Sequence, residues 1–226
     1  MLHLILETKQ SCTAKAHFLA QILHESGSFR YTKEIGGEKA GYAPWYGRGY
    51  IQLTHESNYR DFQAYLGEDI VSSSKNRDKL TKPRLAMLSA GWFYFVKANL
   101  TKYSIDDDFI YITYLINGGY NGFSDRLNYL NKIIESIHDS KCFSRNKDGV
   151  YRLQDSEAFN SIKASFAWGL WHDRASATRG AVKDSNQAIT GYKRYIQLIG
   201  AQASSKLYGI NNPRVFSLER ITALEE

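Results

Sequence analysis

Cysteine, proline and long apolar runs are all scarce in this 226-residue chain. Two cysteines, Cys12 and Cys142, allow at most one bridge, which excludes a fold held together by several disulfides. Three prolines, with no Ser/Gly tract and no block of like charge, exclude a disordered chain or small domains strung on linkers. No stretch approaches the ~20 apolar residues of a membrane-spanning helix. With 43% apolar residues, the chain can bury a core.

The N-terminal residues lack the pattern of a secretory signal. The opening MLHLILETKQ contains a short apolar patch with no basic residue before it. A signal peptide has a charged start followed by an apolar stretch of roughly 7–15 residues. We therefore expect the protein to be made in the cytoplasm without a signal peptide. If it acts elsewhere, another route must deliver it.

Common signatures of cofactor and metal chemistry are also missing. The GRG run at 47–49 fits neither a GxGxxG nor a Walker pattern, so no phosphate-binding loop is predicted. His24-Glu25 begins an HExxH zinc motif, but Ser28 stands where its second histidine would be. The 6 histidines show no metal-ligand spacing, and no GxSxG serine-hydrolase elbow is present. We therefore expect no cofactor and no metal.

Basic and aromatic residues are abundant. A net charge of +6 attracts polyanions, including nucleic acid and anionic bacterial cell wall, without choosing between them. Net charge is the only feature of the sequence that favours nucleic-acid binding, so we expect no nucleic-acid partner. The 16 tyrosines and 4 tryptophans have two interpretations. Interior packing is the simpler one, and platforms that stack on sugar or base rings are the other.

Apolar residues recur with helical spacing far more often than they alternate as in strands. In the first such stretch, Ala16, Leu19 and Leu23 share one face. Helices are predicted over 13–27, 83–100, 106–117 and 125–137, with weaker helical stretches over 156–170 and 186–200. The sequence therefore predicts a mainly α fold.

The segment 29–67 follows the first predicted helix and has no helical period. It is rich in tyrosine, glycine and charge, and loops of this kind on a rigid scaffold commonly carry sites. Glu34 lies in this loop, and Glu25 lies at the end of the helix before it. Two carboxylates that face each other across a cleft can cleave a glycosidic bond by general acid/base chemistry. The spacing alone does not show that Glu25 and Glu34 are catalytic, because either glutamate can also be explained as a solvated surface residue.

Several segments together carry a resemblance to a known family. They are HESGSF at 24–29, YGRGYIQLT at 46–54 with Asn58-Tyr59 after it, and INGG at 116–119 with Asn121-Gly122 and Asp125-Arg126 after it. Their order and residue types resemble glycoside hydrolase family 19, which contains plant and bacterial chitinases and phage endolysins. The resemblance spans about residues 14–137. It implies a mainly helical, lysozyme-like fold.

The resemblance also implies a role for each matching residue. Glu25 matches the general acid, Glu34 the general base that activates a water molecule, and Thr54 the hydroxyl that helps to hold this water. Glu38 is a second acid in the same loop and competes for the role of base. The implied glycan-binding residues are His24, Trp45, Tyr46, Gln52, Asn58, Asn117 and Arg126. Of these, Arg126 matches a residue that orients the catalytic carboxylates.

Some positions in this region have a second interpretation. Trp45 and Tyr46 are either sugar platforms or core residues. Arg48 is more simply explained as a brace for the loop than as a contact to substrate. Ser28 stands where glycine is common in the family, which is a mild change within a turn.

We expect a family 19-like catalytic core over 1–137 and a helical C-terminal extension over 138–226. The extension matches no motif that we can name. We consider three roles for it, in order of preference: it packs against the first catalytic helix, it lengthens the glycan groove, or it binds a partner.

The resemblance implies a glycoside hydrolase that cleaves β-1,4 linkages of N-acetylglucosamine-containing cell-wall polysaccharide with inversion. Few cysteines and a short connection between the acids resemble the bacterial and phage branch, so peptidoglycan is the favoured substrate and chitin the alternative. The expected delivery is holin-type release or contact-dependent secretion, without membrane insertion, and an immunity or inhibitor protein is a candidate partner. The other class of function is a non-catalytic glycan-binding or partner-binding protein on the same scaffold.

Overall fold

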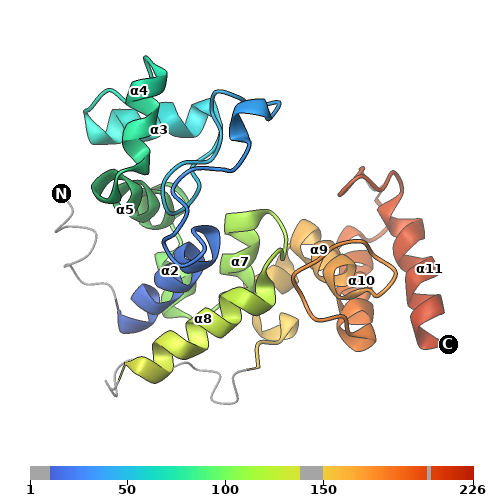
Figure 1. The fold of residues 1–226 in the computed structure, drawn as a ribbon. Helices are drawn as coiled ribbons and strands as arrows, with labels where there is room; N and C mark the ends of the chain where they lie inside the picture. Colours follow the sequence, from blue (N-terminus) through green and yellow to red (C-terminus); the bar gives the residue numbers. More distant parts are fainter. Residues whose placement is uncertain (1–10, 138–149, 203–204) are drawn as a thin grey trace. The chain divides into compact units, whose positions relative to one another are not determined.

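The structure is a computed structural model that describes residues 11–137, 150–202 and 205–226. Regular structure in these ranges is helical, and their β-pairing is limited to isolated bridges (Figure 1). The prediction of a mainly α fold is confirmed. None of the described helices is both long and apolar enough to cross a lipid bilayer. Cys12 is disulfide-bonded, and Cys142 lies outside the described residues.

The described part of the chain divides into two compact units. The first unit consists of 11–105 and 129–137, and the second of 106–128, 150–202 and 205–226. Helix α8 (Phe123–Ser136) contributes to both units. Residues 106–128, which carry the INGG motif, belong to the unit that contains the C-terminal part of the chain. The domain boundary expected at 137 stays a prediction.

The first unit is built from short helices around aromatic side chains. They are α2 (Cys12–Glu25), η1 (Gly37–Lys39), α3 (Glu56–Leu66), α4 (Ser74–Arg77), η2 (Asp78–Thr81), α5 (Pro83–Trp92), the π-helix η3 (Phe93–Lys97) and α6 (Thr101–Ile105). The side chain of Ser11 caps α2 by accepting a hydrogen bond from the Ala14 amide (3.1 Å). Pro83 opens α5, where its missing N–H is not needed. Phe18 packs edge-on against Tyr94, with ring centroids 5.3 Å apart.

The helices predicted over 13–27 and 83–100 correspond to α2 and to α5 with η3. Helix α3 lies inside the segment 29–67 and is not predicted from the pattern. Its buried side chains are Tyr59 and Phe62, in an otherwise polar sequence. Two aromatic rings supply the buried face that several aliphatic residues usually provide, so the helical spacing is easy to miss.

The second unit contains α7 (Phe109–Asn117), the start of α8, η4 (Leu153–Asp155), η5 (Glu157–Asn160), α9 (Ile162–His172), α10 (Ser185–Ile199) and α11 (Pro213–Glu225). The helix expected from 106 begins at Phe109, because Asp108 caps it through its Oδ1 and the Tyr111 amide (3.0 Å). The stretch expected over 156–170 begins with η5, and α9 starts after its cap, Ser161. Helix α11 is not predicted by periodicity.

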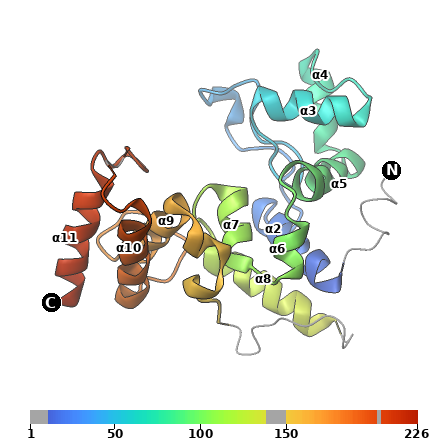
Figure 2. The same ribbon diagram turned by 180° about the vertical axis from the view of Figure 1, so that it is seen from behind.

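Helices α9 and α10 pack closely through two glycines, and α11 packs against α10 (Figure 2). A Cβ atom on Gly191 would lie 2.3 Å from the backbone nitrogen of Gly169. A Cβ atom on Gly169 would lie 2.5 Å from the ring of Tyr192. No side chain fits between these backbones, so both positions require glycine.

A buried carboxylate links the ends of these helices. Asp173, just after α9, accepts hydrogen bonds from Arg220 Nε of α11 (2.7 Å) and from the Tyr192 hydroxyl of α10 (3.0 Å). It also accepts one from the Ala175 amide (2.9 Å). Burial alone would raise the pKa of Asp173, but the hydrogen bonds from Arg220, Ala175 and Tyr192 outweigh it and lower the pKa. The ionised carboxylate is therefore the form that stabilises the unit.

We predict that Asp173→Asn lowers the free energy of unfolding by about 2–3 kcal/mol at pH 7, because it leaves Arg220 without its anion. A folded pKa below the usual 3.8 adds stability above pH 3.8, and this stability is lost as the pH falls through the lowered value. Urea unfolding of both proteins between pH 7 and pH 2 measures the difference. It should be largest at neutral pH and disappear in acid, and a constant difference would contradict the assignment.

Candidate active site

Glu25 is the last residue of α2, and a capped turn follows it directly. The Ser26 hydroxyl donates a hydrogen bond to the Ile22 carbonyl (2.6 Å) and accepts one from the Phe29 amide (2.8 Å). These two bonds close the helix end and fix the direction in which the chain leaves it. Glu25 and the neighbouring His24 are both half-buried. The predicted acid is thus attached to a rigid support.

The turn after Glu25 is left-handed over three consecutive residues. Gly27, Ser28 and Phe29 have φ angles of +54°, +62° and +64°. Side-chain-bearing residues in this region cost roughly 1 kcal/mol each, so the surrounding structure must hold them. One such support is a 2.6 Å hydrogen bond between the hydroxyls of Ser28 and Tyr129. The angle at Ser28 explains why glycine would suit this position.

The loop that carries Glu34 is held by short antiparallel pairings. The Glu34 amide donates to the Gly47 carbonyl and the Gly49 amide to the Thr32 carbonyl, both at 2.9 Å. Arg48 and Leu53 exchange two backbone hydrogen bonds of 3.2 and 2.8 Å. Three backbone segments that include Glu34, Arg48 and Leu53 therefore lie side by side. Thr54 follows directly after Leu53.

Both carboxylate oxygens of Glu34 accept hydrogen bonds within this loop. Oε2 accepts from the Gly47 amide (2.8 Å), and Oε1 accepts from the Tyr42 hydroxyl (2.6 Å). Tyr42 is 39% exposed, and the contact with Glu34 raises its pKa. Two donors at the two oxygens fix the plane of the carboxylate. Tyr42 was not predicted as a site residue. Its position within the glycine-rich loop is the feature of the sequence that could have indicated it.

Glu38, the competing candidate for the base, has different partners. It lies on η1 and forms an ion pair with Lys33 (3.0 Å). A hydrogen bond from its own backbone amide, followed by that from Lys33, lowers its pKa. A carboxylate paired with a lysine holds protons weakly and is a poor base. The geometry therefore favours Glu34, and the choice of base stays a prediction.

Arg48 is the buried centre of this loop. Its side chain is 1% exposed, and its Nε donates to Asp78 at 2.7 Å. Its Nη1 donates to the Tyr59 hydroxyl (2.8 Å) and to the Pro44 carbonyl (3.1 Å). Its guanidinium carbon also lies 3.8 Å from the centre of the Tyr46 ring. These contacts agree with the interpretation of Arg48 as a brace.

The polar residues of the YGRGYIQLT motif and of the helix after it are tied to the loop backbone. The Thr54 hydroxyl donates to the Gln52 carbonyl (2.7 Å), and the Asn58 amide donates to the Thr54 carbonyl (2.8 Å). The Gln52 amide donates to the Gly49 carbonyl (2.9 Å). A Cβ atom on Gly47 would lie 2.7 Å from Gln52 Oε1. Glycine at 47 thus admits the Gln52 side chain next to the amide that holds Glu34.

The two candidate sugar platforms have different surroundings. Tyr46 is 4% exposed, and a Cβ atom on Gly37 would lie 2.6 Å from its ring. Trp45 is half-buried, with the Arg77 guanidinium carbon 4.9 Å from its ring centre and the Tyr59 ring at its edge (5.5 Å). The packing favours a core role for Tyr46. Trp45 keeps part of its surface exposed, so either role remains open to it.

Asn117 and Arg126 belong to the second unit. Asn117 ends α7, and Gly118 after it has a φ angle of +71°. The Asn117 Oδ1 atom is buried and accepts no hydrogen bond from the described residues. Arg126 is fully buried in α8, and its Nε donates to the Asn121 carbonyl (3.2 Å). The structure places the other eight predicted site residues in the first unit.

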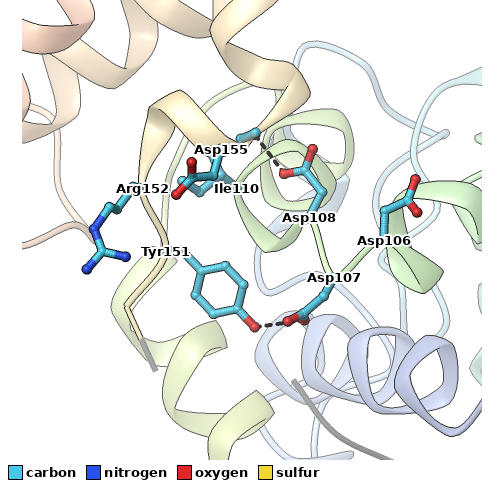
Figure 3. Close-up of a pocket in the computed structure, with 8 residues that line it drawn as sticks. Asp106, Asp107, Asp108, Ile110, Tyr151, Arg152 and Asp155 are labelled. Carbon is cyan, nitrogen blue, oxygen red and sulfur yellow. Dashed lines mark hydrogen bonds between the residues drawn. The ribbon is translucent and has the colours of Figure 1, made fainter. Parts of the chain in front are cut away.

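A further group of carboxylates lies at the start of α7, around a cavity of about 160 Å³ (Figure 3). Asp107 accepts a hydrogen bond from the Tyr151 hydroxyl (2.9 Å), and Asp108 accepts one from Ser156 (2.6 Å). Burial raises the pKa of Asp108. These hydrogen bonds join α7 to the segment around Tyr151 and are structural. No group of three or more potential metal ligands is found among the described residues.

Comparison with known proteins finds a sequence similarity to an endochitinase. No family model matches the chain. An endochitinase of Arabidopsis thaliana is 34% identical over 115 residues, which cover 46% of this chain and 38% of that protein. The chain therefore spans well under half the length of this relative. The resemblance to chitinases that the motifs indicated is confirmed over this stretch.

Solved structures with a similar fold include chitinase C from Streptomyces griseus, with 23% identity, a TM-score of 0.45, and coverage of 55% of this chain and 71% of that one. A chitinase C mutant has 21% identity, a TM-score of 0.48, and coverage of 58% and 75%. The family GH19, class IV chitinase from Zea mays has 19% identity, a TM-score of 0.46, and coverage of 59% and 74%.

We predict that Arg48→Lys lowers the free energy of unfolding by about 2–3 kcal/mol, because an ammonium group cannot replace the fork that joins Asp78 to Tyr59. Chemical denaturation at neutral pH measures this loss. Arg60→Lys in α3 is the matched control, since Arg60 is exposed and, among the described residues, pairs only with Glu56 one turn away. The control should change stability by less than about 0.5 kcal/mol. Equal effects of both variants would show that Arg48 is not the centre of the loop.

Proposed function

We propose that the protein hydrolyses β-1,4 linkages of N-acetylglucosamine-containing cell-wall polysaccharide with inversion. The observation that carries this proposal is the setting of Glu34. Its carboxylate is held by the Gly47 amide and the Tyr42 hydroxyl, in the loop that follows the helix of Glu25. A fixed carboxylate in the loop that follows a second carboxylate on a helix end suits acid/base cleavage.

Each residue has one task in the proposed reaction. Glu25 in its protonated form donates a proton to the glycosidic oxygen as the bond to the anomeric carbon breaks. Glu34 accepts a proton from a water molecule that attacks the opposite face of that carbon, and the Thr54 hydroxyl helps to hold this water. One displacement without a covalent intermediate inverts the anomeric configuration. Gln52, Asn58 and Asn117 bind hydroxyl and N-acetyl groups of the sugar chain.

Peptidoglycan is the favoured substrate within this class. Few cysteines, a short connection between the two acids and a net charge of +6 suit an enzyme that acts on the anionic bacterial cell wall. The names of the relatives support chitin as the alternative, because they are called chitinases. Holin-type release or contact-dependent secretion would deliver the protein, and an immunity or inhibitor protein is the expected partner in the second case.

We predict that Glu25→Gln reduces hydrolysis by about 100-fold or more, the lower end of what a general acid contributes. The amide keeps the shape of the side chain but carries no acidic proton, so the melting temperature should change little. Release of reducing ends from chitin oligomers and from purified peptidoglycan measures the rate. Mass spectrometry of the products identifies the sugar whose bond is cut.

Three results of this experiment are informative. Normal turnover by Glu25→Gln would exclude Glu25 as the acid. A parent protein that binds purified cell wall but cleaves neither substrate would support the non-catalytic glycan-binding alternative. Activity on chitin oligomers without activity on peptidoglycan would replace the favoured substrate with chitin.

The choice of base gives a further prediction. Glu34→Gln should abolish hydrolysis, whereas Glu38→Gln should retain most of it, because Glu38 is exposed and paired with Lys33. If Glu34 acts through water, its carboxyl lies roughly 6.5–9.5 Å from that of Glu25 in the reacting complex, and the first product has the inverted configuration. Proton NMR of fresh chitin-oligomer products reads the anomer before it equilibrates. A retained anomer would rule out the water-mediated mechanism, and the opposite ranking of the variants would assign the base to Glu38.

A further inference from the structure

The C-terminal part of the second unit contacts the INGG motif directly. The motif forms a turn at 117–121, called here the Asn117 turn. It follows α7 and contains Asn117, Gly118 and Gly119 of the family resemblance. Two side chains from distant parts of the sequence, Tyr208 and Trp171, hold this turn. Both lie in the C-terminal extension, which matches no motif of the family resemblance.

Tyr208 binds the backbone of the Asn117 turn. Its hydroxyl donates a 2.6 Å hydrogen bond to the Gly118 carbonyl, the residue after Asn117. The Tyr208 ring lies 5.5 Å from that of Trp171, in an edge-to-face arrangement. A hydroxyl aimed at one carbonyl fixes that peptide plane and therefore the residue before it.

Tyr208 itself is held in an unusual conformation. Leu207 and Ile210 exchange backbone hydrogen bonds of 3.1 and 2.8 Å, which makes a tight turn with Tyr208 and Gly209 at its tip. The φ angles at the tip are +48° for Tyr208 and +84° for Gly209. Glycine or asparagine is usual at both positions of such a turn. A tyrosine kept there against its backbone preference points to a role for its side chain.

Trp171 of α9 holds the other end of the Asn117 turn. A Cβ atom on Gly119 would lie 2.7 Å from the Trp171 ring, so the ring packs directly on the glycine backbone. The Trp171 indole nitrogen donates to Asn121 Oδ1 at 3.2 Å. The turn is thus fixed at Gly118 by Tyr208 and at Gly119 and Asn121 by Trp171. Such support leaves Asn117 little freedom to change its direction.

The side chain of Asn117 provides the observation that indicates a ligand. Its Oδ1 is buried and accepts no hydrogen bond from the described residues. A buried carbonyl oxygen without a donor is unfavourable, and an N–H or O–H group of a glycan would supply one. This benefit requires that the oxygen be held in one place before the glycan arrives.

We infer that the C-terminal segment contributes to the glycan-binding site, because Tyr208 and Trp171 act as positioning residues that fix the Asn117 turn. This inference rests on the proposed glycan hydrolysis and adds a role for the segment beyond covering the first catalytic helix. Tyr208 acts through Asn117 and needs no contact with the sugar.

The test uses Tyr208→Phe, which keeps the ring and removes the hydrogen bond to Gly118. Binding of the N-acetylglucosamine hexamer is measured by calorimetry in the Glu25→Gln background, so that the glycan is not cleaved. The Kd should rise by about 5-fold, which corresponds to one neutral hydrogen bond. Asn117→Ala and the double variant complete a cycle. Since Tyr208 acts through Asn117, adding Tyr208→Phe to Asn117→Ala should change the Kd by less than about 1.5-fold.

Tyr192→Phe is the matched control, because it removes the hydrogen bond from Tyr192 to Asp173 in the same unit. It should lower the melting temperature and leave the Kd unchanged. Hydrogen exchange of the peptide around Gly118 and Gly119 gives a readout without glycan, and exchange should be faster in Tyr208→Phe than in the control.

Two failures of this test have different meanings. If the Glu25→Gln protein binds the hexamer and Tyr208→Phe binds it equally well, the inference is wrong and the proposed function stands. If the Glu25→Gln protein binds neither the hexamer nor purified peptidoglycan, the proposed function is wrong and the inference is rejected with it. Equal effects of Tyr208→Phe with and without Asn117 would also overturn the inference, because Tyr208 would then not act through that residue.

Discussion

The buried guanidinium of Arg48 is the interaction on which the candidate site depends. A charged group at the centre of a loop is costly unless it is paired, and Arg48 donates through Nε and Nη1 to Asp78, Tyr59 and loop carbonyls. Those partners come from separate segments of the first unit, so the cost of burying the charge is offset only when the loop is closed. Closing the loop brings Gly47 to Glu34. The charge therefore stabilises the closed arrangement of this loop.

The two predicted catalytic acids have supports of different kinds. Glu25 stands on a helix that is packed through Phe18 and capped at its end by Ser26. Glu34 stands on a bridged loop and takes its orientation from an amide and a phenol. The left-handed residues between them, including Ser28, turn the chain within a few residues from one support to the other. Backbone strain at this place fits a site whose geometry takes precedence over local stability.

The sequence was sufficient for helices that bury several apolar residues at helical spacing, such as α2 and α5, and for end signals such as Gly118. It was insufficient for α3, where Tyr59 and Phe62 alone make the buried face. The domain boundary at 137 stays a prediction, and local pattern did not indicate that 106–128 share a unit with the C-terminal segment. Contacts between residues far apart in the sequence decide which segments share a compact unit. Periodicity within a short window carries no information about such contacts.

The same limit applies to the candidate site. Motif matching could propose Glu34 and Glu38 as bases, but only the partners Tyr42 and Lys33 distinguish the two carboxylates, and neither belongs to a motif. Arg48 was interpreted as a brace from the sequence, and its contacts with Asp78 and Tyr59 agree with that interpretation. The C-terminal segment is the extreme case. A family comparison gives it no motif because its contribution consists of single contacts to the backbone of another segment, and such contacts leave no local pattern in the residues that make them.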